Sequence, residues 1–444
     1  MSVQSLLSDL VSSDYYPQSV SVFAEHIPHD CLQLATQHAN QVTVRRRKLV
    51  SEYVLWLVVG MAFFRNEPLI EIARRMNISL DGQSVDTVLA KSALTQARQK
   101  LGSESMAWLF RHSGEHWATE RYPDDTWQGL QVFAIDGALF RTADTPELRD
   151  HFGSGNTGSD RQTPYPLCRV VTVMNVHSHV LLDAQINSYR TNEMKLASDM
   201  LDKLPDNSIT LLDKGFFSAA LLHQIHDKGH QRHWLLPMRK SCKYEVVADY
   251  GDGDQLIEMH TSPAARKQHP ELPDKWQARA VTYQLGQDSK TVLTSLPADH
   301  FEAKTVAALY HQRWQIELGF RDIKSSMQHN ALTLRSKTVE WVCQELWGSL
   351  LAYNLIRREA SLAAVSHGYS PDDVSFKFAC QFITAELINM AVAVSPANTP
   401  KRLKNLRGNI AILFLKKRPR PSRPRAVKMS KTRYPVNYNA SPLK

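Results

Sequence analysis

The sequence predicts an α/β fold whose sheet-containing middle is flanked by helical regions. Apolar residues recur at helical spacing up to about residue 128, and strand-like runs then alternate with helices from Leu130 onward. Long helical patterns return after about residue 304. Such an alternation is typical of a sheet with helices packed on it, and 444 residues with 43% hydrophobic content suffice for a large core.

The first region is expected to be a group of helices. Apolar positions at helical spacing occur within residues 45–78 and 84–102, and Gly102 would be the C-cap of the last helix. Two short helices, with Arg98 and Lys100 exposed on the second, could form a helix-turn-helix-like DNA reader. A plain helical bundle with solvated basic residues is the more common outcome for this pattern, and both interpretations remain open.

The middle of the chain has the pattern of a mixed sheet. Strands are expected at 130–136, 168–176, 179–186, 208–213 and 233–238, with helices at 193–201 and 219–229. Four further strand-like runs follow within residues 243–303, separated by Gly, Asp and Pro turns, and predict a β-rich insertion into the α/β domain. Helices are expected to complete the fold at 310–327, 339–365 and 376–394.

The expected division of the chain follows these changes of pattern and ends in a basic tail. The parts are a helical N-terminal DNA-binding region (1–128), a first part of the core (129–242), the insertion (243–303), a second part of the core (304–368), a C-terminal helical region (369–400) and the tail (401–444). The tail holds 14 Lys or Arg and no Asp or Glu, although the whole chain is only +9. It is rich in Pro, so we expect it to be disordered and to bind phosphate backbones through residues such as Lys416, Lys417 and Arg418. A solubilising tail is the alternative.

Membrane and secreted classes fit this sequence poorly. The longest apolar run, residues 54–64, is too short to cross a bilayer, and no basic leader precedes an apolar core near residue 1. The five cysteines are scattered and include no C-x-x-C pair, which argues against a disulfide framework or a zinc site. We therefore expect a cytoplasmic protein with no membrane partner.

Two acidic residues stand out because each is expected at the end of a buried strand. Asp136 follows an apolar strand and precedes Gly137, and Asp213 follows another and precedes Lys214 and Gly215. A carboxylate at the end of a strand, with Gly allowing close approach of the backbone, is a common way to present an acid at a sheet edge. The alternative is that each Asp only starts a turn, and for one Asp alone that is the usual outcome.

A third acid lies on the helix expected at 310–327, in a row of functional side chains. At about 100° per residue, Tyr310, Arg313, Glu317 and Lys324 fall within roughly a 60° stripe of one face. A salt-bridged solvent face is the usual explanation. It fits poorly here, because aromatic residues share the patch and the row borders an apolar stripe. The apolar stripe comprises Leu309, Ile316, Phe320, Ile323 and Met327.

Three carboxylates brought together would suit a hard divalent cation, Mg²⁺ or Mn²⁺. Two such ions about 3.5–4 Å apart can activate an attacking oxygen and stabilise the leaving oxygen of a phosphodiester. Arg313 and Lys324 on the same face could then hold phosphates near the reacting bond. The spacing alone does not prove that the three acids meet.

Three motifs in this order resemble those of a known enzyme family. They are Ile135-Asp136-Gly137, the LLDKGF run at 211–216 and the Y-x2-R-x3-E-x6-K pattern from Tyr310 to Lys324. Together they resemble the DDE transposases of bacterial insertion sequences, and more narrowly the Y-R-E-K subgroup, the insertion-sequence-4 family. The resemblance covers about residues 40–360 and includes a β-rich insertion between the second Asp and the Glu.

The resemblance implies a ribonuclease-H-like catalytic core and assigns roles to the motif residues. The implied metal-binding triad is Asp136, Asp213 and Glu317, and the residues implied to position DNA phosphates are Tyr310, Arg313 and Lys324. Ala138 departs from the small polar residue that often follows the Gly in this family, which bears on a backbone or phosphate contact and leaves metal binding untouched.

The implied activity is two-metal, in-line transesterification without a covalent protein–DNA intermediate. Water would cut one strand at each element end, and the freed 3′-hydroxyl would attack target DNA, with a hairpin step in some members. The implied partners are double-stranded DNA, at terminal inverted repeats and target, and a second copy of the chain in a homodimer on paired ends. Trp276 is a candidate for stacking on a flipped base, although a buried Trp is the commoner outcome in a β-rich region.

Two other functions remain open at this point. The first is a non-catalytic DNA-binding protein derived from a transposase, which the presence of all six signature residues disfavours. The second is a ribonuclease-H-like nuclease that cuts without strand transfer, because cutting and joining would use the same triad.

Overall fold

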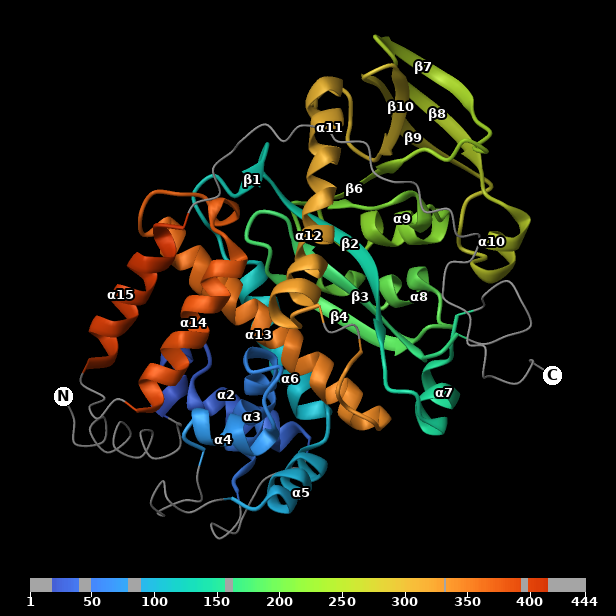
Figure 1. Cartoon of the computed structure of the whole chain (residues 1–444). Helices are drawn as coiled ribbons and strands as arrows, with labels where there is room; N and C mark the ends of the chain where they lie inside the picture. The colour runs from blue at the N-terminus through green and yellow to red at the C-terminus, as the bar shows by residue number, and fades with distance from the viewer. Residues whose placement is uncertain are drawn as a thin grey trace.

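The computed structural model of the chain describes residues 18–39, 49–78, 89–155, 163–330, 333–392 and 398–413. Within these residues the strands form one ten-stranded sheet in the order β4-β3-β2-β5-β6-β10-β9-β8-β7, with β1 paired to β2 (Figure 1). The strands are β1 (Thr126–Trp127), β2 (Leu130–Arg141), β3 (Leu167–Asn175), β4 (Leu181–Ser188), β5 (Ser208–Leu211), β6 (Arg232–Pro237), β7 (Glu245–Gly251), β8 (Asp254–His260), β9 (Lys275–Leu285) and β10 (Asp288–Thr294). The strands expected from the sequence are thus confirmed.

Helices precede, interrupt and follow these strands. The N-terminal group comprises η1 (Gln18–Phe23), α2 (His29–His38), α3 (Ser51–Phe63), α4 (Leu69–Arg75), α5 (Lys91–Leu101) and α6 (Glu104–Ala118). Between strands lie α7 (Pro146–Phe152), α8 (Glu193–Ser198), η2 (Leu201–Lys203), η3 (Lys214–Phe216), α9 (Ala219–Asp227) and α10 (Pro263–Gln268). After the sheet come α11 (Ala303–Tyr310), η4 (His311–Arg313), α12 (Trp314–Arg321), η5 (Asp322–Met327), α13 (Val339–Val365), η6 (Pro371–Asp373), α14 (Phe376–Ala391) and α15 (Thr399–Ala411).

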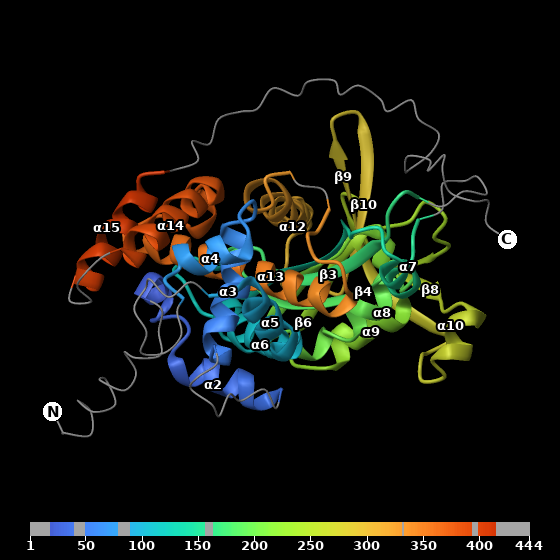
Figure 2. The ribbon, with the colours of Figure 1, turned by 60° about the horizontal axis from the view of Figure 1, so that its bottom comes forward.

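The first half of the sheet mixes antiparallel and parallel pairing. Strands β2, β3 and β4 form an antiparallel meander, while β5 pairs in parallel with both β2 and β6. Residues of β3 and β5 are buried on both faces, as strands are when helices cover a sheet on two sides. Figure 2 shows α12 over one face of these strands and α8 and α9 over the other.

The expected β-rich insertion continues the central sheet. Strand β10 pairs antiparallel with β6, with Leu293 opposite Leu236, and β9, β8 and β7 follow in turn. A buried ion pair joins β9 to β8, since Arg279 donates to both carboxylate oxygens of Asp254 at 2.8 and 2.7 Å. The strands of residues 243–303 therefore belong to the same layer as the strands of the core.

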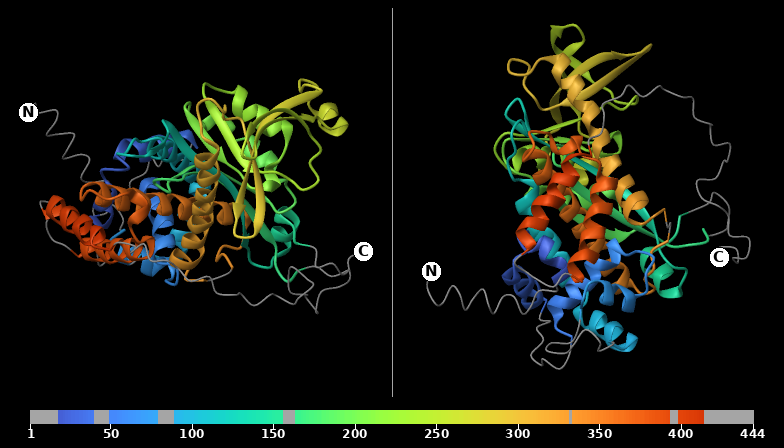
Figure 3. Two further views of the ribbon diagram at one scale, coloured as in Figure 1. Left: turned by 90° about the horizontal axis from the view of Figure 1, so that it is seen from above. Right: turned by 60° about the vertical axis from the view of Figure 1, so that its left-hand side comes forward.

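The N-terminal helices pack against the long helix α13, on the side of the molecule opposite β7–β10 (Figures 1 and 3). Almost every residue of α3 is buried, which is the pattern of a helix enclosed on all sides. The two helices approach closely at Gly348, where a Cβ would lie 2.7 Å from Cγ1 of Val58. The helical N-terminal region expected from the sequence is thus built onto α13.

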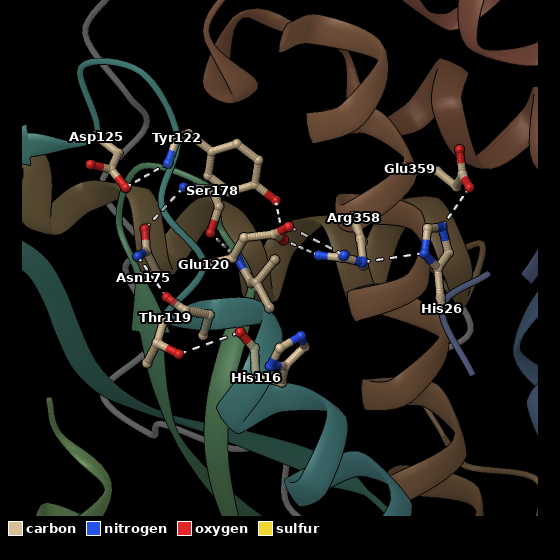
Figure 4. Close-up of polar contacts among 12 residues, drawn as sticks. His26, His116, Thr119, Glu120, Tyr122, Asp125, Asn175, Ser178, Arg358 and Glu359 are labelled. Atoms are coloured by element: carbon tan, nitrogen blue, oxygen red, sulfur yellow. Dashed lines mark hydrogen bonds and ion pairs between the residues drawn. The ribbon is translucent and has the colours of Figure 1, made fainter. Parts of the chain in front are cut away.

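A buried polar network links the N-terminal region to α13 and α15 (Figure 4). His26 Nε2 lies 2.5 Å from a carboxylate oxygen of Glu359, and Arg358 donates to His26 Nδ1 at 3.2 Å and also to Glu120. Because Nδ1 accepts from Arg358, Nε2 carries the proton and donates to Glu359. Arg407 of α15 closes the network by donating to both oxygens of Glu359, at 2.9 and 3.0 Å.

The expectation that the tail is disordered from residue 401 is wrong at its start. Residues Thr399–Ala411 form α15, which packs on α13 and α14. Leu403, Leu406 and Ile410 are buried and form an apolar stripe at helical spacing. The many basic residues around them led to the prediction of disorder. Lys416, Lys417 and Arg418 lie outside the described residues. In the described part of the chain, no helix is both long and apolar enough to span a membrane.

Candidate active site

Asp136 and Asp213 lie next to each other at one edge of the parallel part of the sheet. In the register of β2 with β5, Ala134 is opposite Leu211, and each Asp lies two residues further along its chain. The prediction that Asp136 ends its strand is wrong, because β2 continues to Arg141 through its pairing with β3. Asp136 is nevertheless at the edge of the parallel pairing, since β5 stops at Leu211.

Backbone groups orient both carboxylates. The Gly137 N–H donates to Asp136 Oδ1 at 2.8 Å, and the Gly215 N–H donates to Asp213 Oδ1 at 2.6 Å. A Cβ at Gly215 would lie only 2.7 Å from that same oxygen. The Gly in the motif after the second acid is therefore required by the close approach of the Asp213 carboxylate.

The two sides of β2 face different helices. A Cβ at Gly137 would lie 2.9 Å from a carboxylate oxygen of Glu193, which belongs to α8. Side chains alternate along a strand, so Asp136 points to the opposite face, where Arg313 lies within 3.7 Å of it. The metal-ligand candidates thus face the segment Ala303–Met327 and are separated from α8 by the sheet.

The segment expected as one helix over 310–327 consists of four consecutive helical pieces. Helix α11 ends at Tyr310, a 3₁₀ turn (η4) follows, α12 carries Glu317, and a π-helical turn (η5) carries Lys324. A π turn inside a helix is frequent at functional sites and changes the direction of the residues that follow. All four residues of the predicted row are half-buried, as expected for a row at the edge of a buried face.

Arg313 connects the acids of the two elements. Its Nη1 lies 3.7 Å from Asp136 Oδ2, and its Nη2 donates to Glu317. The pKa of Asp136 is raised to about 6: burial raises it most, the Gly137 N–H and Arg313 lower it, and the charges of Asp213 and Glu317 also raise it. The structure therefore brings the three predicted acids, from three separate segments, close enough to influence one another.

Tyr310 and Lys324 flank this cluster. Burial raises the pKa of Tyr310 to about 12, so its hydroxyl remains protonated at neutral pH, and Arg313 and Asp213 also act on it. The ammonium of Lys324 lies 4.9 Å from the centre of the Phe140 ring, and burial lowers its pKa while Asp136 raises it. The six residues singled out by the sequence pattern therefore form one cluster.

Within the described residues, no group of three His, Cys, Asp or Glu side chains has the arrangement of a preformed metal site. The guanidinium of Arg313 lies between Asp136 and Glu317. The chemistry of the donors nonetheless fits a hard divalent cation, because all three are carboxylates and the charges of Asp213 and Glu317 contribute to the raised pKa of Asp136. A cation would relieve that repulsion.

Two other candidates from the sequence are buried: Arg98, which was expected to be exposed, and Trp276, for which burial was the commoner expectation. Arg98 is 5% exposed and donates to Gln344 of α13 at 2.7 Å, so it is not an exposed DNA contact; Lys100, on the same helix, is exposed. Trp276 is 7% exposed and packs in an aromatic cluster, so this conformation does not present it to a base. Its ring neighbours are Phe217, His223 and Trp234. Both side chains fill space between elements whose packing cannot be seen in local sequence.

One residue near the site was not noticed in the sequence. Arg239 follows β6 and donates to the carbonyls of Lys214 and Gly215, at 3.0 and 3.1 Å, which holds the turn after Asp213. Its guanidinium also lies 5.3 Å from the centre of the Phe217 ring. The spacing in the sequence contains no signal for this contact, because it depends on the pairing of β5 with β6.

Comparison with known proteins agrees with this site. A family model described as a transposase DDE domain matches residues 127–355, and one described as an insertion element 4 transposase N-terminal domain matches residues 17–111. The Escherichia coli K12 transposase InsG for insertion sequence element IS4 is 37% identical over 431 residues, 96% of each chain. InsZ of the same strain is 34% identical over 443 residues, 99% of each chain.

Among solved structures, the piggyBac transposase synaptic complex with hairpin DNA covers 93% of this chain and 88% of its own, with 13% identity and a TM-score of 0.44. That likeness is too distant to argue from. The family matches define the class of protein: it is an enzyme, a DNA transposase with a DDE domain. Within that class, the chain belongs to the insertion element 4 family.

Proposed function

We propose that Asp136, Asp213 and Glu317 are the catalytic triad of a ribonuclease-H-like core. The observation that carries this proposal is the position of Arg313, whose guanidinium lies 3.7 Å from Asp136 and also pairs with Glu317, so that a strand acid and a helix acid meet beside Asp213. The raised pKa of Asp136, caused first by burial and then by the charges of Asp213 and Glu317, agrees with this closeness. The strand order supports it too: an antiparallel meander continues into two parallel strands, and both Asp residues lie at the edge where ligands of α/β sheets usually bind.

The three carboxylates would hold two divalent cations, Mg²⁺ or Mn²⁺. When bound, such ions activate the attacking oxygen and stabilise the leaving oxygen of a phosphodiester. The other residues hold DNA: Arg313 offers its planar fork to a phosphate, Lys324 its point charge and Tyr310 a hydroxyl that donates a hydrogen bond. In this proposal Arg313 leaves Glu317 for the phosphate when the transposon end binds.

The proposed reaction has two steps at phosphorus, a hydrolysis followed by a transesterification. In the first, the oxygen of water attacks, the bond from phosphorus to the 3′-oxygen breaks, and a free 3′-hydroxyl end remains. In the second, that hydroxyl attacks a target phosphodiester, so one phosphorus–oxygen bond forms as another breaks. Because both ends of an element must be joined together, we propose that two copies of the chain act on paired ends.

The experiment that tests this proposal is a strand-transfer assay. Full-length protein would be mixed with a supercoiled plasmid and a duplex bearing the terminal repeat of the element that encodes the chain, already cut to expose its 3′-hydroxyl. We expect Mg²⁺- or Mn²⁺-dependent joining, and none when the end is a 3′-dideoxynucleotide. Cutting of an uncut end without joining would favour the nuclease alternative. Binding without either reaction would favour the non-catalytic DNA-binding protein.

A further inference from the structure

We propose that Arg357 is a positioning residue that holds the Glu317–Lys324 segment in its working place through a buried ion pair with Asp322. This inference rests on the proposed function of Glu317 and Lys324. Asp322 lies between these two residues, at the first position of the π turn η5. Its Oδ2 accepts a hydrogen bond from Arg357 Nη2 at 2.6 Å, and both side chains are shielded from solvent.

Arg357 is itself fixed from three sides. It lies in the interior of α13, its Nε lies 3.2 Å from the Tyr353 hydroxyl oxygen, and its guanidinium lies 4.7 Å from the centre of the Phe376 ring of α14. Tyr353 and Phe376 are buried and contact each other, with ring centroids 5.1 Å apart. The guanidinium thus has a single well-supported position, and Asp322 is attached to it.

Tyr353 also limits how closely helix α12, which carries Glu317, can approach the sheet. A Cβ at Gly319, two residues after Glu317, would lie 3.0 Å from the Tyr353 hydroxyl and 3.2 Å from Met174 Sδ. Met174 is on β3, directly opposite Ala134 of the strand that carries Asp136. The contacts at Gly319 and Asp322 therefore set the height of Glu317 and Lys324 above Asp136.

The pair is better explained by positioning than by stability. Taking two charges out of water is costly, and replacing a buried ion pair by apolar residues of similar volume is often neutral or stabilising. Since Asp322 lies between Glu317 and Lys324, the use of the pair is to fix the geometry of these two residues. Misplacing a catalytic group by about 1 Å can slow a reaction about 10²-fold.

The test separates positioning from folding by removing the whole pair. In the double variant Asp322→Leu/Arg357→Met no buried charge is left alone, and we expect a melting temperature close to that of the wild type. Single-turnover cleavage of a transposon-end duplex should be about 10²-fold slower, a much larger change than that of the dissociation constant for the end, to which Lys324 contributes one phosphate contact among several. Arg357→Lys, which keeps the charge but loses the fork, should recover part of the rate.

The matched control is the neighbouring residue Arg358, which donates to Glu120 and to His26 of the N-terminal region (Figure 4). Arg358→Met is expected to lower the melting temperature. Its single-turnover rate, measured well below that melting temperature, should equal that of the wild type. A double variant that cleaves as fast as the wild type would overturn the inference.

A second readout does not depend on cleavage at all. Hydrogen–deuterium exchange of the amides in residues 320–327 should become faster in the double variant, while exchange in β3 stays as in the wild type. Unchanged exchange in residues 320–327 would contradict the positioning role. Failure of the wild type itself to cut any end would contradict the proposed function and leave this second readout decisive for Arg357.

Discussion

Replacing Asp136 with Asn should stabilise the metal-free protein, although it should abolish cleavage. The Asp136 side chain is 18% exposed, and its pKa of about 6 exceeds the ordinary value of 3.8 because of burial and the charges of Asp213 and Glu317. One pKa unit corresponds to about 1.4 kcal/mol, so the charged carboxylate destabilises the folded state by about 3 kcal/mol. Asn has nearly the same shape without the charge.

The gain should depend on pH in a definite direction. Since the pKa is higher in the folded than in the unfolded chain, the unfolded chain loses its proton first as pH rises, and the wild type loses stability between about pH 4 and 6. The advantage of Asp136→Asn should therefore be about 3 kcal/mol at pH 8, about half of that at pH 5, and absent below the unfolded pKa.

Urea unfolding at pH 8 and pH 5, in buffer with a chelator, measures both values. Asp299→Asn is the control, because Asp299 is an exposed Asp whose loss should leave the free energy of unfolding nearly unchanged. Added Mn²⁺ should stabilise the wild type and not Asp136→Asn. An Asp136→Asn variant that is no more stable than the wild type at pH 8, or whose gain is equal at both pH values, would refute the reasoning.

Three further predictions concern other parts of the chain. Arg98→Met should lower the free energy of unfolding by about 1–3 kcal/mol, because Gln344 loses a buried hydrogen bond. The salt dependence of DNA binding should stay unchanged, and a reduced salt slope would mean that Arg98 is a DNA contact after all. Deleting residues 416–444 should weaken DNA binding and reduce the slope of log K against log salt by about 0.9 for each phosphate that the shortened protein no longer neutralises, and an unchanged slope would count against a DNA-binding tail. Gly215→Ala should keep the melting temperature but slow metal-dependent cleavage, because its Cβ displaces the Asp213 carboxylate; wild-type cleavage would mean that this carboxylate adjusts without loss.

The local sequence pattern located most helices and strands correctly. Most of the features that it did not predict depend on pairing between strands that are distant in the sequence. The strand-like runs of residues 243–303 were located correctly, but their union with β6 depends on contacts between segments distant in sequence. The length of β2 was underestimated for the same reason, since β3 extends it past Asp136. Charged residues also led to two wrong predictions. Arg98 was expected to be exposed but is buried, where it donates a hydrogen bond to Gln344. Residues 401–411 were expected to be disordered because they are basic, but they belong to helix α15, which has a buried apolar stripe.

The residues of the candidate site could be predicted from the sequence, but their detailed geometry could not. The spacing from Tyr310 to Lys324 indicated one face, and all four residues do lie at the border of the buried side. Two details could not be predicted: the π turn that carries Lys324 and the pairing of Arg313 with Glu317. Both depend on contacts with residues of α13 and β2, which are distant in the sequence.

The central claim is that Glu317 supplies the third catalytic carboxylate, and one cleavage assay tests it most directly. A labelled duplex bearing the terminal repeat would be incubated with Mg²⁺ or Mn²⁺ and either wild type, Glu317→Gln or Glu302→Gln, the last being an exposed Glu at the start of the same helical segment. The account predicts that wild type and Glu302→Gln cut the duplex, whereas Glu317→Gln binds it and does not cut. Equal cutting by all three proteins would contradict the assignment of Glu317 to the triad.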